Sequence, residues 1–212
     1  MIAASRFGVP ASSRMRSAGA GVRAALALAL TLGLAACGSS PVPTYDLSAP
    51  SQFTAAGAGR GQLVVVQPTA LAVLDTEKIV IEPAPGQITY LSDAQWSDRL
   101  PALLQARTIQ AFENGSKLRR VARPGDGVTA DYQLNTNIRA FGVRVAPDGT
   151  AEAVVELSVK LIANQSGRIL DAHVFSSRVP LGALNGPSVT RGLDQATDTV
   201  LVEMVRWASG RF

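Results

Sequence analysis

Two long segments in the second half of the chain alternate between apolar and polar residues, and this restricts the folds open to the sequence. The first has its less polar residues at every second position, namely Tyr132, Leu134, Thr136, Ile138 and Ala140. The second repeats the pattern from Ala153 to Leu161. Because successive side chains of a strand point to opposite faces, each segment predicts a strand with one buried and one wet face. The chain therefore has to form a sheet that is covered on one side.

The first alternation slips where it ends. The order of apolar and polar residues changes at Phe141–Gly142–Val143, and a glycine inside a strand pattern often marks a bulge. We therefore expect a bulge at Gly142 and a Phe141 side chain that faces outward.

Shorter signals predict the other strands. Runs of β-branched residues cover 63–67 and 78–82, and each ends at a proline. The second run is followed by a turn and a hairpin partner over 87–91. A last strand is expected over 168–179.

Two segments have apolar residues at helical spacing. One runs over 99–113, where Ser97 or Asp98 is placed to cap the helix and Pro101 suits its first turn. The other begins after Gly186–Pro187 and runs to about residue 208. The predicted fold class is α+β, with a mostly antiparallel sheet and two helices packed on one face.

The N-terminus has the features of a secretory signal. Four arginines precede an apolar run over 24–34, which is too short for the roughly twenty residues of a spanning helix. Leu34-Ala35-Ala36-Cys37 then resembles the bacterial lipobox, whose cysteine is acylated before the chain is cut. We expect residues 1–36 to be a lipoprotein signal peptide, with Met15 as a second candidate start. The alternative is a general secretory signal that happens to be cut near a cysteine.

Residues 37–61 are rich in Gly, Ser, Pro and Ala. This composition predicts a lipidated flexible tether with a reach of roughly 25 Å, in which Tyr45, Leu47 and Phe53 dock part of the segment as an extended strand. Residues 62–212 are then the periplasmic α+β domain.

Charge argues against nucleic acid as a partner. The formal net charge of +4 comes from 20 basic and 16 acidic residues, and four of the arginines, but no acid, precede Cys37. The rest of the chain is formally neutral. It therefore lacks the basic excess that phosphate binding requires.

Residues that perform chemistry are scarce. The sequence contains no GxxxxGK[ST], HExxH, CxxC or GxSxG motif, and its single histidine, His173, has no neighbouring ligand that would complete a metal site. We interpret His173 as an ordinary strand residue and Asp93 and Asp98 as solvated or capping carboxylates. No catalytic residue, metal or cofactor is expected apart from the covalent diacylglycerol and N-acyl chains on Cys37.

A dense basic cluster is the main candidate for an interaction surface. Its members are Lys117, Arg119, Arg120 and Arg123. It either contacts lipid head groups or an acidic partner, or protects an exposed edge strand by its charge. Three aromatic residues, Tyr90, Trp96 and Phe141, are further candidates for a partner interface, and buried packing is the alternative for Tyr90 and Trp96.

Several short patterns, taken in order, resemble one known family. They are Ile88-Thr89-Tyr90-Leu91, Trp96, Arg99-Leu100-Pro101, Leu103-Leu104-Gln105, Asn114-Gly115, Ala130-Asp131-Tyr132-Gln133-Leu134 and Ile138-Arg139-Ala140-Phe141. This order is similar to that of the auxiliary lipoproteins of ABC-type transport systems, over about residues 45–207. The chain departs from the pattern where a second proline would precede Pro101 and at the polar Ser116-Lys117.

The resemblance implies a non-catalytic, membrane-anchored periplasmic lipoprotein. Its partners would be an MCE-domain protein, which moves lipids between the two membranes of Gram-negative bacteria, and the associated ABC permease and ATPase. We expect an anchor in the outer membrane and note that self-association is compatible with such a role. The alternative is an envelope-assembly or cell-wall-regulating lipoprotein that binds a synthase or a polysaccharide.

We predict that Cys37→Ser leaves an uncleaved precursor without lipid, because acylation requires the thiol. The domain itself should still fold, since its expected core does not include Cys37. Metabolic labelling with a fatty acid, followed by mass measurement, tests the substitution. Label on the variant would contradict the assignment of Cys37.

Overall fold

The computed structural model describes residues 41–57, 59–118 and 120–211, of which Val42 onward form one compact unit. Cys37 and Arg119 lie outside the described residues. The elements are β1 (Thr44–Tyr45), β2 (Leu63–Val65), β3 (Thr69–Ala70), β4 (Lys78–Ala84), β5 (Gln87–Trp96), α2 (Leu100–Gly115), β6 (Val121–Ala122), β7 (Tyr132–Val145), β8 (Ala151–Ala163), β9 (Arg168–Leu181) and α3 (Gly186–Ser209).

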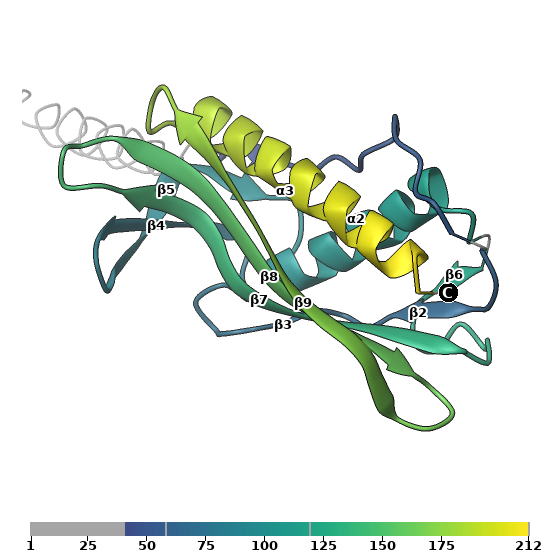
Figure 1. The fold of residues 1–212 in the computed structure, drawn as a ribbon. Helices are drawn as coiled ribbons and strands as arrows, with labels where there is room; N and C mark the ends of the chain where they lie inside the picture. The colour runs from purple at the N-terminus through teal and green to yellow at the C-terminus, as the bar shows by residue number, and fades with distance from the viewer. Residues whose placement is uncertain (1–40, 58, 119, 212) are drawn as a thin grey trace, which may run out of the picture. The chain divides into compact units, whose positions relative to one another are not determined.

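One long strand, β7, organises the sheet (Figure 1). Along one edge β7 pairs with β8, which pairs with β9, and both pairings are antiparallel. Along its other edge β2, β3 and β4 follow one another, all parallel to β7. The expected hairpin of β4 and β5 is antiparallel, while β1 and β6 add short parallel pairings. The α+β class is confirmed, but the sheet is mixed.

The two helices cover one face of this sheet, as predicted. The alternating residues of β8 are fully buried there with the apolar stripe of α3, which includes Leu193, Val200 and Met204. Both helices have a proline in the first turn, where the missing N–H costs nothing. The N-cap prediction for α2 is wrong. Arg99 holds that position without a side-chain bond, while the Asp98 carboxylate accepts a hydrogen bond from the Arg99 N–H (2.6 Å).

A bulge in β7 lies earlier than expected and reverses the orientation of Phe141. The register against β8 shifts between Ile138 and Ala140, so that Arg139 is the extra residue. Before the bulge the even-numbered residues face the helices, and after it the odd-numbered residues do. Phe141 is therefore only 3% exposed and packs edge-on against Trp96, with ring centroids 6.0 Å apart. The predictions of an outward Phe141 and of a bulge at Gly142 were wrong.

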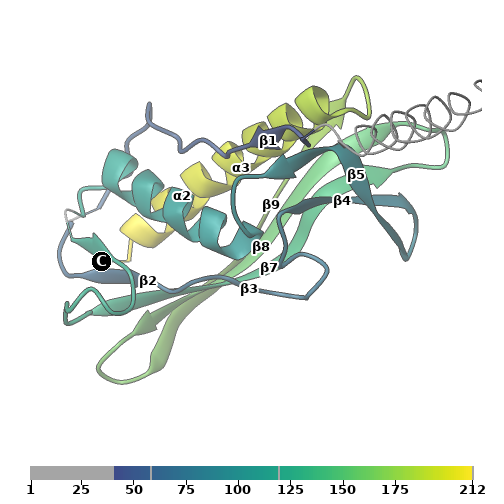
Figure 2. The same ribbon diagram turned by 180° about the vertical axis from the view of Figure 1, so that it is seen from behind.

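Residues 43–57, which we call the N-terminal strap, are packed against the domain (Figure 2). The strap begins with β1 beside β5, and its Ser48 N–H donates to Asp194 of α3 (2.6 Å). Further on, the Ala55 N–H donates to the Gly115 carbonyl at the end of α2 (2.7 Å). Leu47 and Ala55 are buried. The domain thus begins about twenty residues before the expected boundary at residue 61, because the few apolar residues of the segment join the core.

We predict that Gly115→Ala destabilises the domain, although alanine is favoured over glycine in a helix by about 1 kcal/mol. A Cβ at this position would overlap the ring of Phe53, so the strap would have to move. Phe53→Ala should remove the overlap, and Gly115→Ala should then become neutral or stabilising in that background. Urea denaturation of the four proteins of this cycle tests the contact. Equal effects of Gly115→Ala in both backgrounds would contradict it.

Candidate functional site: an apolar hollow on the open face of the sheet

The face of the sheet that is turned away from the helices, which we call the open face, carries apolar residues that the sequence analysis did not predict there. Val80 of β4, Gly142 of β7 and Val154 of β8 are paired in register across three strands. Their neighbours along each strand, such as Ile81 and Phe141, belong to the core. Since side chains alternate between faces, Val80 and Val154 point to the open face. Both are nevertheless more than nine-tenths buried.

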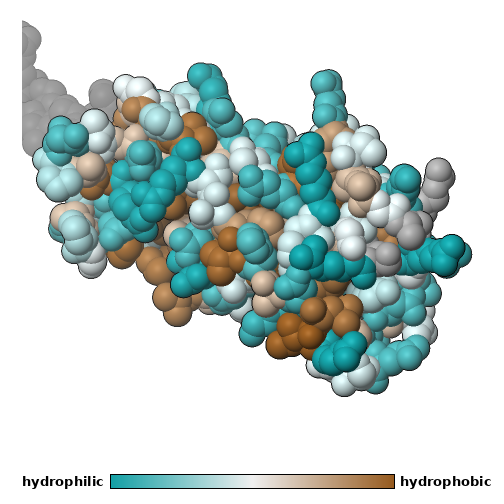
Figure 3. Space-filling view, in the orientation of Figure 1, coloured by the Kyte–Doolittle hydropathy of each residue, from teal (hydrophilic) through white to brown (hydrophobic). Residues whose placement is uncertain are grey.

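The segment between β3 and β4 covers this position and leaves a hollow of about 200 Å³. Its lining is mostly apolar and includes Leu71, Val73, Val80, Ile88, Gly142 and Val154. Leu71 is 73% exposed and Ile88 48% exposed at the rim. An ion pair between Asp75 and Arg99 (2.6 Å) holds the covering segment against the start of α2. Hydrophobic side chains show at the surface over this segment and over β9 (Figure 3).

Gly142 is required at the floor of the hollow. A Cβ there would collide with the carbonyl oxygen of Val80, so any other residue would push β4 away from β7. The bulge at Arg139 brings Gly142 to this face. The close approach of the two backbones therefore depends on a bulge and a glycine placed three residues apart.

The charged groups around the hollow neutralise one another. Arg144 pairs with Glu82 (3.0 Å), and Arg139 pairs with Glu156 (3.1 Å). The hydrogen bond from Arg144, with a second from the Gly86 N–H, lowers the pKa of the Glu82 carboxyl. With its rim charges paired and its walls apolar, the hollow suits an uncharged apolar group, such as a side chain of another protein.

Of the three aromatic residues considered for an interface, only Tyr90 is at the surface. It is 39% exposed on the open face, where the Lys78 ammonium lies 5.1 Å from its ring centroid. Trp96 is 1% exposed and, like Phe141, part of the core. Buried packing is therefore the correct interpretation of Trp96.

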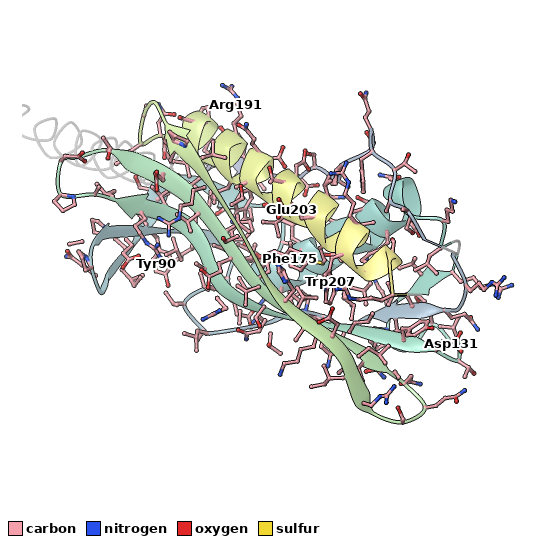
Figure 4. All side chains as sticks on the ribbon, in the orientation of Figure 1. Tyr90, Asp131, Phe175, Arg191, Glu203 and Trp207 are labelled. Atoms are coloured by element: carbon pink, nitrogen blue, oxygen red, sulfur yellow. The ribbon has the colours of Figure 1, made fainter. Side chains whose placement is uncertain are left out.

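The basic cluster lies apart from the hollow. Lys117, Arg120 and Arg123 are exposed near β6, an edge strand that pairs with β2, and within the described part of the chain none of them forms an ion pair. Figure 4 shows Tyr90 and Asp131 at opposite ends of the sheet, and Asp131 bonds the Gln62 N–H beside β2. The structure thus does not bring the cluster and Tyr90 together.

Asp93 and His173, which were considered as residues that could perform chemistry, make contacts within the fold. Asp93 accepts a hydrogen bond from the Gly186 N–H at the start of α3 (2.9 Å). The exposed His173 ring lies against Phe175 and Trp207, at centroid distances of 4.6 and 6.3 Å. Among the described residues, no group of three His, Cys, Asp or Glu side chains could hold a metal ion.

A second hollow, of about 670 Å³, opens between the strap and α3. It is more polar, and its lining includes Ser48, Phe53, Asp198, Glu203 and Arg206. The Asp198 Oδ1 atom is buried without a hydrogen-bond partner. Burial, together with the nearby Asp194 carboxylate, raises the pKa of Asp198. The ionised Asp198 therefore costs stability at neutral pH.

We predict that Asp198→Asn stabilises the domain at pH 7.5 by up to about 1 kcal/mol, because it removes an unpartnered charge that is only partly screened by water. A raised folded-state pKa favours the protonated form in the fold. The advantage of the variant over the wild type should therefore shrink as the pH falls towards 4. Urea denaturation at pH 7.5 and at pH 4 measures the difference in the free energy of unfolding between the variant and the wild type. An equal difference at both would contradict the role of the charge.

The whole domain corresponds to a known family. The family model of the ABC-type transport auxiliary lipoprotein component matches residues 45–205. An uncharacterized protein of Bradyrhizobium diazoefficiens is 30% identical over 165 residues, which cover 77% of this chain and 44% of the relative. The chain thus spans less than half the length of that relative.

Solved structures show the same fold. A DUF330 protein from Xanthomonas campestris has a TM-score of 0.72 and 26% identity, covering 78% of this chain and 94% of its own. An uncharacterized protein has a TM-score of 0.62 at 16% identity, covering 80% of this chain and all of its own.

The chain belongs to the ABC-type transport auxiliary lipoprotein component family. This confirms the resemblance inferred from the sequence. No helix among the described residues is long and apolar enough to cross a membrane.

Proposed function

We propose that the protein is a non-catalytic subunit that links an MCE-type ABC lipid-transport system to a membrane, through acyl chains on Cys37. Its place is the periplasm, and the membrane is the outer one. The partner on the transport side is the MCE-domain protein, which in turn contacts the permease and the ATPase. No cofactor takes part.

The observation that carries this proposal is the apolar hollow on the open face of a domain from a transport-auxiliary family. A subunit that performs no chemistry acts through its surfaces. Leu71 and Ile88 expose apolar side chains at the rim, and the paired charges around them disfavour a charged ligand. An apolar side chain of the MCE protein, inserted between Leu71 and Ile88, would bury their exposed surface above Val80 and Val154.

We predict that the double substitution Leu71→Ser and Ile88→Ser weakens binding to the MCE protein by about 30- to 900-fold, since burying the two side chains together contributes about 2 to 4 kcal/mol. Stability should change little, because both side chains are exposed. Ile169→Ser is the matched control, as Ile169 is 51% exposed at the far end of β9. The acylated protein is used, and pull-down followed by titration measures binding.

Charge-reversal variants test whether the basic cluster contributes to binding in addition to the hollow. Arg120→Glu with Arg123→Glu should weaken binding more at low salt than at high salt if the cluster also contacts the partner, and leave it unchanged if the cluster only protects β6. A clean failure of the folded, acylated wild type to bind the MCE protein would overturn the proposal. It would favour the envelope-assembly alternative.

A further inference from the structure

The chain is fixed to the domain very soon after the expected acylation site. The Pro43 carbonyl accepts a hydrogen bond from the Gln95 N–H (3.0 Å), and Thr44 pairs with Gln95 in register. From this point the strap continues along α3 and ends where Gly57 approaches the Ser209 carbonyl. Residue 43 is therefore the place where the domain is attached to whatever precedes it.

The covalent chain sets an upper limit on the distance between Cys37 and Pro43. These residues are six positions apart, which corresponds to about 20 Å at full extension and about 12 to 15 Å as a root-mean-square value for a flexible chain. A tether that remained free to residue 61 would reach roughly 25 Å on average and about 80 Å when extended. Docking of the strap thus removes most of the reach that the composition of the segment predicts.

The end of the domain beside Pro43 carries exposed apolar groups. Val42 is 40% exposed, and Leu184, in the loop before α3, is 47% exposed. Both belong to the same end, because the Gly186 N–H bonds Asp93, two residues before the Gln95 that holds Pro43. Arg191, in the second turn of α3, adds an exposed cation near this end (Figure 4). We call Val42, Leu184 and Arg191 the anchor end.

The basic cluster lies at the other end of the helices. The 24 residues of α3 extend about 36 Å. Gly57 is beside the last residues of α3, and Gly59 lies so close to Lys117 that a Cβ on Gly59 would collide with it. The cluster is therefore about the length of α3 away from the anchor end.

We infer that the bilayer which holds the acyl chains also docks against the anchor end, so that α3 points away from the membrane and the basic cluster faces the periplasm. Apolar Val42 and Leu184 suit the interface between head groups and acyl chains, and Arg191 suits anionic head groups. This inference rests on the acylation of Cys37 in the proposed function. It excludes the lipid head groups of the same membrane as the ligand of the basic cluster.

Depth-dependent quenching tests the orientation. Acylated protein is placed in vesicles of phosphatidylethanolamine and phosphatidylglycerol at three to one, with a fluorophore on Leu184→Cys or on Ile169→Cys. The two sites are similarly exposed, but Ile169 lies at the opposite end of β9. Spin-labelled lipid should quench the label at 184 at least threefold more than the label at 169. Equal quenching at both sites, or none at 184, would overturn the inference.

Lengthening the linker tests the role of its shortness. Twenty Gly and Ser residues inserted between Pro41 and Val42 should at least halve the quenching at 184, and unchanged quenching would overturn the argument from chain length. The mass of the N-terminal peptide verifies acylation in every sample. Binding of the MCE protein, measured on the same vesicles, shows separately whether the proposed function fails.

Discussion

A one-residue bulge at Arg139 of β7 determines which of the following side chains face the core and which face the open side of the sheet. β7 pairs with β8 along one edge and with β2, β3 and β4 along the other, and the bulge separates the part of β7 that pairs with β2 and β3 from the part that pairs with β4. The bulge turns Phe141 into the core against Trp96. It also turns Gly142 to the open face, where β4 can approach. Core and hollow are thus two consequences of the same local distortion.

The sequence was sufficient to predict the elements that local periodicity specifies. The strands now seen as β7, β8 and β9, the hairpin of β4 and β5 and both helices were all expected within a few residues of their observed bounds. The parallel pairing of β2, β3 and β4 with β7 was not, because the alternation of side chains is the same in parallel and antiparallel neighbours. The strap was underestimated for another reason: composition predicts flexibility, whereas three or four well-placed apolar residues are enough to dock a segment.

The candidate site was harder to predict than the fold. Val154 stands between Ala153 and Val155, where the alternation calls for a polar residue, and this was a local signal of a second apolar surface. Trp96 was left with two interpretations because its type suits both a core and an interface, and only burial distinguishes them. Leu71 is in a segment without periodicity. Its role depends on β4 and β7 lying side by side, which is a long-range property of the chain.

The arrangement of the surfaces limits how partners can be bound. The hollow is on the open face of the sheet, while the basic cluster is beside the edge strand β6 at the end of α2. The strap hydrogen-bonds to both helices, through Ser48 on α3 and Ala55 on α2, and so fixes the start of the domain relative to both surfaces. A single partner that contacts the cluster and the anchor end together has to span about the length of α3, roughly 36 Å. A smaller partner has to choose one of them. Under the proposed docking of the anchor end, the fold and not a flexible linker sets the distance of each surface from the membrane.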